Sequence, residues 1–370
     1  MKSTKEILYF ENLDGLRFLA AFSVLVFHSF GRLKQFNSFQ ESVICRVLSF
    51  LAEKGDHGVS FFFVLSGFLI TYLTLKEIDK NKSFNAINFF LRRAFRIWPV
   101  YFIVVFYGLY ISPLLFHHLF FGKKLMYFSF LANFDMIRHF PGTVYFQNFF
   151  MNVLWSVSIE EQYYFCWATL MFFLQLKRVF HFVCFFIAVI LVSSLYRILY
   201  PNEVYHTLFV ISDLGVGGLL AICVFNYQGI VKSLRTISKP IIIIIYILGF
   251  IILFYENIFQ IEIFYFKRLM LTFFWAFIIF EQSFMENSFY KMSKSKILSK
   301  LGKITYGVYM YHSIMIIVIQ AFWIKYSWPS DDEVVFYLQL TLITITTILV
   351  SSLSYNFIEF PLLKIKDRFK

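Results

Sequence analysis

The first pair of residues that could do chemistry lies near the N-terminus, where Arg17 and His28 interrupt an apolar stretch. Eleven helical residues turn through about 1,100°, so both side chains fall on one stripe, roughly 16 Å apart along the axis. An arginine there can anchor an anion, and an imidazole can act as a general base. The alternative is a snorkelling arginine and a histidine that only hydrogen-bonds a neighbouring helix.

A second candidate is Glu160, which shares a helical face with Ser156 and Tyr164 in the segment 155–164. The predicted span runs from outside to inside, so Glu160 lies about a turn and a half below the outer surface. His28 lies near that depth, and a carboxylate beside it would fix its tautomer and raise its basicity. The alternative is a pair of interfacial carboxylates that face water.

Arg93 and Arg96 are three residues apart and share one helical face on the predicted cytoplasmic side. Two guanidinium forks there suit a phosphorylated ligand that approaches from the cytoplasm. An ordinary positive cluster that contacts lipid headgroups explains the same spacing equally well.

Three further groups of polar residues need an explanation. Asp213 and His312 lie inside apolar stretches, where each either lines a polar cavity or makes a structural hydrogen bond. His117, His118 and His139 share one outer loop, but no known ligand spacing supports a metal site, and we predict none. The sequence contains no Walker loop, no GxSxG elbow and no HExxH motif.

The elements that carry these residues are strongly apolar. Of the 370 residues, 59% are hydrophobic, 22% are aromatic and only 15% are charged. A soluble domain is about 45–50% apolar and about 25% charged, so a globule of this composition would lack the polar surface to cover itself. The sequence is neither that of a collagen-like protein nor that of a disulfide scaffold, because it contains few Gly (15), Pro (7) and Cys (4) residues. The composition predicts a polytopic membrane protein.

We therefore expect an all-α membrane protein, a bundle of about ten transmembrane helices that forms a single domain over residues 1–370. The segment 356–370 is expected to be a short cytoplasmic tail, and the N-terminal stretch a first span rather than a cleaved signal peptide. The expected spans are 13–32, 57–75, 97–116, 154–176, 182–200, 205–225, 240–255, 266–283, 304–324 and 334–356.

The orientation follows from the basic residues in the connections. With the N-terminus inside, 22 of the 34 Lys and Arg residues lie in inner segments and 10 in outer ones. This bias predicts that both termini are cytoplasmic. It also accounts for the net charge of +12 without a nucleic-acid partner.

Taken together, the polar segments resemble the membrane-bound acyltransferase family 3, integral O-acyltransferases of bacterial polysaccharides and related molecules. Six segments carry the resemblance, and they occur in the family's order along the whole chain. They are Arg17-x10-His28, the run 58–68, Arg93-x-x-Arg96-Ile97-x-Pro99-x-Tyr101, Trp155-Ser156 through Glu160 to Tyr164, Tyr306-Gly307 through His312, and Glu359-x-Pro361.

The resemblance implies an acyl-CoA donor, usually acetyl-CoA, that enters from the cytoplasm, and a sugar hydroxyl acceptor on the outer side. It implies that His28 is the catalytic imidazole, with Glu160 orienting it or balancing its charge, and that Arg17, Arg93 and Arg96 contact the CoA end. We expect no permanently bound cofactor and no metal. The expected cavity-lining residues are Asp14, Ser66, Tyr101, Trp155, Tyr164, Asp213 and His312.

In the mechanism that we expect, His28 takes the proton of the acceptor hydroxyl, which attacks the thioester directly. A covalent acyl-histidine is the other route. Some relatives carry an additional outer hydrolase-like domain, and none is expected here. The outer loops 33–56 and 117–151 are expected to select the acceptor, whose identity and acyl length stay open.

Two other classes of protein fit the same features. A transporter or flippase of acyl groups or lipid-linked sugars uses intramembrane charges without making a bond. A scaffold in a polysaccharide-export complex would need neither His28 nor Glu160 for chemistry. The expected location is the plasma (inner) membrane, with a glycan or glycolipid, the bilayer and polysaccharide-assembly proteins as partners.

Overall fold

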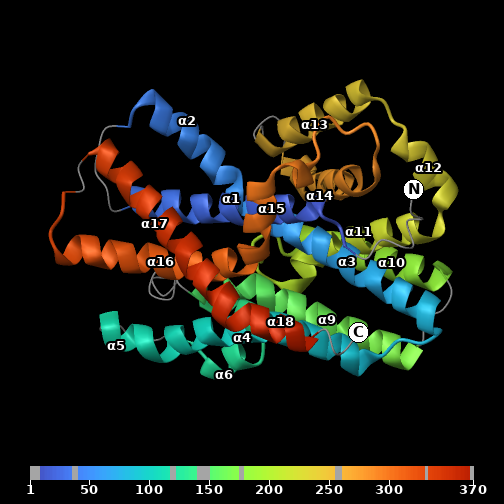
Figure 1. Ribbon diagram of the computed structural model, residues 1–370, viewed down its shortest axis with the longest axis horizontal. Coiled ribbons are helices and arrows are strands. Elements are labelled where there is room, and N and C mark those ends of the chain that lie inside the picture. Colours follow the sequence, from blue (N-terminus) through green and yellow to red (C-terminus); the bar gives the residue numbers. More distant parts are fainter. Residues whose placement is uncertain are drawn as a thin grey trace. The chain divides into compact units, whose positions relative to one another are not determined.

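Every regular element in the described part of the chain is helical (Figure 1). The computed structural model describes residues 9–35, 41–116, 122–139, 151–174, 179–254, 261–329 and 332–366. The α-helices are α1 Asn12–Lys34, α2 Val43–Ala52, α3 His57–Asn81, α4 Ala86–Phe106, α5 Ser112–Phe116, α6 Lys124–Phe128, α7 Ala132–His139, α9 Leu154–Leu174, α10 Val179–Leu199, α11 Thr207–Asn226, α12 Gln228–Arg235, α13 Lys239–Phe254, α14 Ile261–Phe284, α15 Lys296–Leu301, α16 Thr305–Lys325, α17 Glu333–Ser354 and α18 Phe360–Lys366.

Fewer helices qualify as membrane spans than the ten predicted. Among the described residues, seven helical stretches are long and apolar enough to cross a membrane, and α12 with α13, bent by 95°, makes an eighth if the pair is one span. All ten predicted segments fall on helices, but α9 and α14 are not in this set. Their charged residues explain why, since α9 contains Glu160 and Glu161, and α14 contains Lys267, Arg268 and Glu281.

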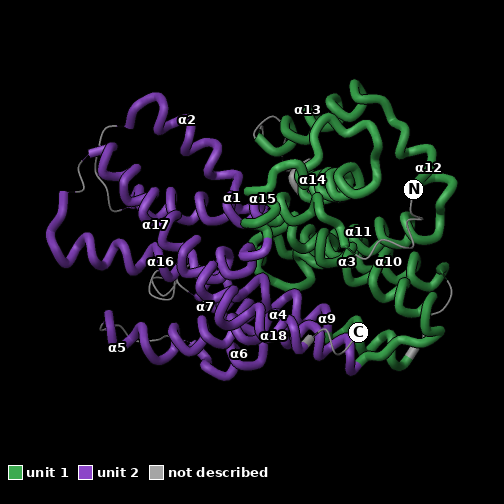
Figure 2. Tube along the Cα trace, in the orientation of Figure 1, with its two compact units in different colours: residues 1–17, 59–86, 165–302 green, residues 18–58, 87–164, 303–370 purple. Residues whose placement is uncertain are grey.

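The chain folds into two compact units, each assembled from three separate segments (Figure 2). Unit 1 contains Met1–Arg17, Val59–Ala86 and Phe165–Gly302, and unit 2 contains Phe18–Gly58, Ile87–Tyr164 and Lys303–Lys370. Because the segments alternate along the sequence, neither unit is a contiguous domain, and the single-domain organisation stays a prediction.

Unit 1 depends on glycines where α3 crosses α11. A Cβ atom at Gly67 would lie 2.0 Å from the Leu214 carbonyl oxygen, and one at Gly217 would lie 2.0 Å from that of Val64. Both distances are far below van der Waals contact, so only glycine lets these two backbones approach each other. The close approach fixes the position of Asp213, which lies one turn before Gly217 on α11.

Unit 2 has its own apolar core, formed by α1, α2, α16 and α17. The rings of Phe30 and Phe336 meet edge to face at 4.9 Å between centroids. Ser42, the N-cap of α2, donates from its hydroxyl to Glu333 at 2.7 Å, which ties α2 to the start of α17. The buried core residues are Phe30, Leu33, Cys45, Ala52, Ile316, Phe336 and Ile343. Beyond α17 the chain stays helical through Lys366, within the segment predicted as a tail.

Candidate active site

The candidate base, His28 on α1, pairs with a second imidazole from α16. His28 Nδ1 lies 2.8 Å from Nε2 of His312, and the two rings stack 5.0 Å apart at an interplanar angle of 10°. His312 is fully buried, whereas His28 is partly exposed. The sequence predicted both residues in the cavity but did not predict that they pair.

The hydrogen-bond network assigns the protons of this pair. His312 Nδ1 lies 3.3 Å from the Val308 carbonyl oxygen, which can only accept, so Nδ1 of His312 carries the hydrogen. Neutral His312 then has its lone pair on Nε2, and His28 donates to it from Nδ1. The lone pair of His28 is therefore on Nε2, which is the atom that a general base needs.

A tyrosine and a serine connect α16 to α9 next to the imidazole pair. The Tyr309 hydroxyl lies 2.6 Å from Ser156 Oγ, and Ser156 donates to the Val153 carbonyl oxygen at 3.2 Å. The Tyr309 ring meets the His312 ring edge-on at 5.9 Å between centroids. Because the serine's hydrogen goes to Val153, Tyr309 donates its own to Ser156.

Glu160 follows Ser156 by one turn of α9, on the face that the sequence predicted. Tyr164 donates to Glu160 Oε2 at 3.1 Å, and the Arg93 guanidinium lies over the Tyr164 ring at 5.6 Å. Among the described residues, His28 hydrogen-bonds to His312, and Glu160 accepts a hydrogen bond from Tyr164. The predicted pairing of Glu160 with His28 stays a prediction. The series His28, His312, Tyr309, Ser156, Glu160, Tyr164 and Arg93 thus lies within unit 2.

Glu161 is a buried carboxylate for which no function is predicted from the sequence. It is 4% exposed, its Oε2 accepts a hydrogen bond from Trp98 Nε1 at 3.1 Å, and its Oε1 has no hydrogen-bond partner in the described part of the chain. Trp98 belongs to the same helix, α4, as Arg93. The signal was the helical period, because neighbours differ by about 100° and Glu161 must therefore point in a different direction from Glu160.

The predicted phosphate-binding arginines differ in their surroundings. Arg17 pairs with Asp14 on the first turns of α1, at 2.6 Å between Nη1 and Oδ1, and Asp14 also accepts from the Tyr9 hydroxyl. Arg93 is partly buried, and its Nε has no hydrogen-bond partner within the described residues. Arg96, one turn further along α4, is exposed.

The remaining predicted lining residues are spread over both units. Tyr101 of α4 is buried and donates to the Tyr127 carbonyl oxygen at 2.8 Å. Burial, together with the Asp135 carboxylate to which the Tyr127 hydroxyl donates, raises the pKa of Tyr127 well above its ordinary value. Trp155 of unit 2 and Ser66 of unit 1 are both partly buried.

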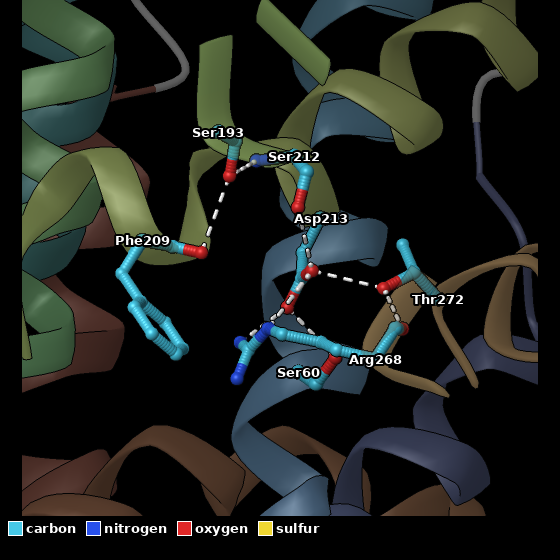
Figure 3. A network of polar contacts seen from close by, with 7 residues as sticks. All are labelled: Ser60, Ser193, Phe209, Ser212, Asp213, Arg268 and Thr272. Carbon is cyan, nitrogen blue, oxygen red and sulfur yellow. Dashed lines mark hydrogen bonds and ion pairs between the residues drawn. The ribbon is translucent and has the colours of Figure 1, made fainter. Parts of the chain in front are cut away.

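Asp213, a predicted lining residue of unit 1, is fully buried in an ion pair (Figure 3). Arg268 Nη2 lies 2.6 Å from its Oδ2, and the hydroxyls of Ser60 and Thr272 donate to it at 2.7 and 2.9 Å.

No metal site is predicted at the three histidines of the outer loop, His117, His118 and His139. His117 and His118 lie outside the described residues. In the ranges that the structure describes, no group of three His, Cys, Asp or Glu side chains is placed to hold a metal ion.

Comparisons with known proteins give the chain its family. The family model for the acyltransferase domain of family 3 matches residues 10–356. The peptidoglycan O-acetyltransferase OatA of Listeria monocytogenes is 33% identical over 177 residues, which cover 45% of this chain and 25% of that protein. The candidate peptidoglycan O-acetyltransferase YrhL of Bacillus subtilis is 30% identical over 167 residues, 43% of this chain and 23% of that protein.

A third relative aligns along almost the whole chain. A candidate O-acetyltransferase of Staphylococcus aureus is 24% identical over 97% of this chain, which corresponds to 58% of that protein. The chain therefore spans about a quarter of the length of the first two relatives and little more than half of the third. No solved structure matches the chain. With a match over nearly its full length, and with seven helical stretches among the described residues that are long and apolar enough to span a bilayer, the chain belongs to the acyltransferase 3 family of multi-pass membrane proteins.

Proposed function

We propose that this protein is an O-acetyltransferase of the plasma membrane. It takes an acetyl group from acetyl-CoA on the cytoplasmic side and transfers it to a hydroxyl of a cell-surface glycan or glycolipid. The family match and the relatives named for peptidoglycan O-acetylation support a glycan acceptor of that type. The observation that carries the proposal is the His28–His312 pair, whose hydrogen bonds leave the lone pair of His28 on Nε2.

In the proposed reaction His28 Nε2 takes the proton of the acceptor hydroxyl while that oxygen attacks the thioester carbonyl. The tetrahedral intermediate then collapses, the carbon–sulfur bond breaks and the CoA thiolate leaves. The proton held on His28 passes to the thiolate, so the cycle ends with an ester, free CoA and neutral His28. A covalent acyl-histidine would use the same nitrogen, and mass spectrometry of the protein after mixing with acetyl-CoA alone distinguishes the two routes.

His312 is proposed to position His28 for this step. When His28 gains a proton, its Nδ1–H becomes a stronger donor to the lone pair on His312 Nε2, 2.8 Å away. The stacked rings and the bond from His312 to Val308 prevent the pair from rotating. His312 would thus stabilise the imidazolium without itself touching the substrate.

Arg93 is the best placed of the proposed donor-binding residues. Its Nε is unpaired within the described residues, and the Tyr164 ring below it holds the guanidinium in place. A phosphate of CoA offers the oxygen acceptors that such a fork requires. Arg96 is exposed on the same helix.

The proposal is tested by supplying purified protein in lipid nanodiscs with acetyl-labelled acetyl-CoA and fragments of peptidoglycan glycan. An acetyltransferase releases CoA and forms labelled ester in equal amounts. A transporter of acyl groups or lipid-linked sugars yields neither product, and that result would overturn the proposal. Label that appears on the protein but not on the glycan would indicate a different acceptor.

A further inference from the structure

Unit 1 contains a buried arginine whose hydrogen-bonding capacity is mostly unused. Arg197, near the end of α10, is 2% exposed. Its described hydrogen bond runs from Nη2 to Ser194 Oγ at 3.3 Å, a neutral group on its own helix. Nε and Nη1 have no hydrogen-bond partner in the described ranges. A buried guanidinium in this state is costly unless an anion accompanies it.

The nearby carboxylate cannot serve that purpose, because its acceptor positions are already used. Oδ1 of Asp213 accepts from Ser212, Thr272 and Arg268 Nε, and Oδ2 accepts from Ser60 and Arg268 Nη2 (Figure 3). Thr272 shares its one hydrogen with the Arg268 carbonyl oxygen at 2.7 Å, so four donors and this shared contact fill the roughly four lone-pair positions of the carboxylate. Asp213 neutralises Arg268 and leaves the charge of Arg197 without a direct partner.

The two arginines belong to one cluster in unit 1. Ser193, one turn before Arg197, donates to the Phe209 carbonyl oxygen at 3.2 Å, and the guanidinium of Arg268 lies 5.9 Å from the centre of the Phe209 ring. Arg197, Arg268 and Asp213 are close enough to interact electrostatically. The Arg268 side chain is 27% exposed, whereas Arg197 is 2% exposed, so the accessible edge of the cluster is at Arg268.

We propose that Arg197 and Arg268 form a binding site for a phosphate group. The cluster combines two guanidinium groups with one saturated carboxylate, and guanidinium forks match phosphate oxygens in number and geometry. Arg197 lies two residues before the end of α10, and Asp213 six residues after the start of α11. These are the helix ends predicted to face outside, where the phosphates of membrane lipids lie. The phosphate belongs either to such a lipid or to a small soluble anion.

This inference does not depend on acetyl transfer and is tested by binding. The full chain, purified in an uncharged maltoside detergent, is titrated with dioleoylphosphatidylglycerol, with inorganic phosphate, or with dioleoylglycerol, which lacks the phosphate. Thermal unfolding, followed by tryptophan fluorescence, reports the apparent affinity, since a ligand of the folded state raises the Tm. The variants are Arg197→Gln and, as a matched control, Arg46→Gln, which removes an exposed arginine from α2.

A phosphate site predicts that Arg197→Gln weakens the response at least about tenfold, whereas Arg46→Gln leaves it unchanged. A response to phosphatidylglycerol alone identifies a lipid, and an equal response to inorganic phosphate identifies a small anion. Equal responses of the two variants, or an equal effect of dioleoylglycerol, would overturn the site.

The stability without ligand gives a second, independent measurement. If the function of Arg197 is to bind an anion, then Arg197→Gln is at least as stable as the natural protein in the absence of phosphate, because a buried charge without a hydrogen-bonded carboxylate is gone. A large loss of stability in that variant would instead assign Arg197 a structural role and contradict the proposal. A second variant, Arg197→Lys, keeps the charge but loses the fork, and it should fold and show the same weakening of phosphate binding.

Discussion

The two units each bury a centre of polar residues, and the centres are built in opposite ways. In unit 1, Asp213 is fully buried and accepts from five donors, so its charge is locked in place. In unit 2, His28 and His312 share one short hydrogen bond between two imidazoles. The first arrangement holds helices together. The second can gain and lose a proton with little rearrangement, which is what acid–base chemistry requires.

The contrast shows that a polar residue inside an apolar helix is not by itself a sign of chemistry. Asp213 and His312 were equivalent in the sequence, where each was either a lining residue or a structural hydrogen bond. The difference lies in the partners, because a saturated carboxylate has no acceptor position left for a substrate. Variants of the two centres should therefore fail in different ways.

The largest expected effect is that of His28→Ala on acetyl transfer. Removal of the general base should lower kcat by about 10²- to 10⁴-fold, while the protein still inserts and unfolds near its normal temperature. Ester formation with labelled acetyl-CoA and thermal unfolding measure the two properties. The control His181→Ala removes an exposed histidine of α10 and should be neutral in both. Unchanged transfer in His28→Ala would contradict the proposed base.

Asp213→Asn should show the opposite pattern. Loss of the carboxylate leaves Arg268, whose side chain is 27% exposed, without its counter-ion, so the stability should fall by at most about 3–5 kcal/mol. The fraction that remains folded should keep its kcat. Chemical or thermal unfolding of this variant is compared with that of Asp79→Asn, which changes an exposed aspartate of α3. Equal stability of the two variants would remove the distinction between the centres.

His312 offers an intermediate case. His312→Ala should lower kcat by about 10- to 100-fold and leave the KM for acetyl-CoA unchanged, because the residue orients His28 but does not contact the donor. His312→Gln should recover part of the loss, since an amide oxygen can accept from His28 Nδ1. A merely structural role predicts instead that Ala and Gln are equally impaired and that both variants unfold at lower temperature.

The smallest effect is expected for the donor site. Arg93→Ala should raise the KM for acetyl-CoA by about tenfold with little change in kcat, since it removes one charge-assisted contact to phosphate. Arg92→Ala, which removes the neighbouring charge from another face of the same helix, is the matched control. If both variants raise KM equally, then the basic residues of α4 attract the anionic donor together, and Arg93 makes no specific contact with it.

Part of the candidate site could be predicted from the sequence, because the helical period determines which residues of one helix lie on the same face. The stripe from Arg17 to His28 and the face shared by Ser156, Glu160 and Tyr164 depend only on 3.6 residues per turn. The number of spans was less predictable. Hydropathy distinguishes apolar from polar stretches, and α9 and α14 contain both.

The sequence by itself determined that the chain is helical and apolar, which residues lie on the same helical face, and to which family the chain belongs. Only the tertiary structure decided that His28 meets His312 rather than another polar group, that Arg268 neutralises Asp213, and that Arg197 keeps unused donors. Those pairs join residues 284 and 55 positions apart in the first two cases. No local periodicity links such distant positions, because their contact arises only when separate helices pack and buried polar groups select the partners within reach.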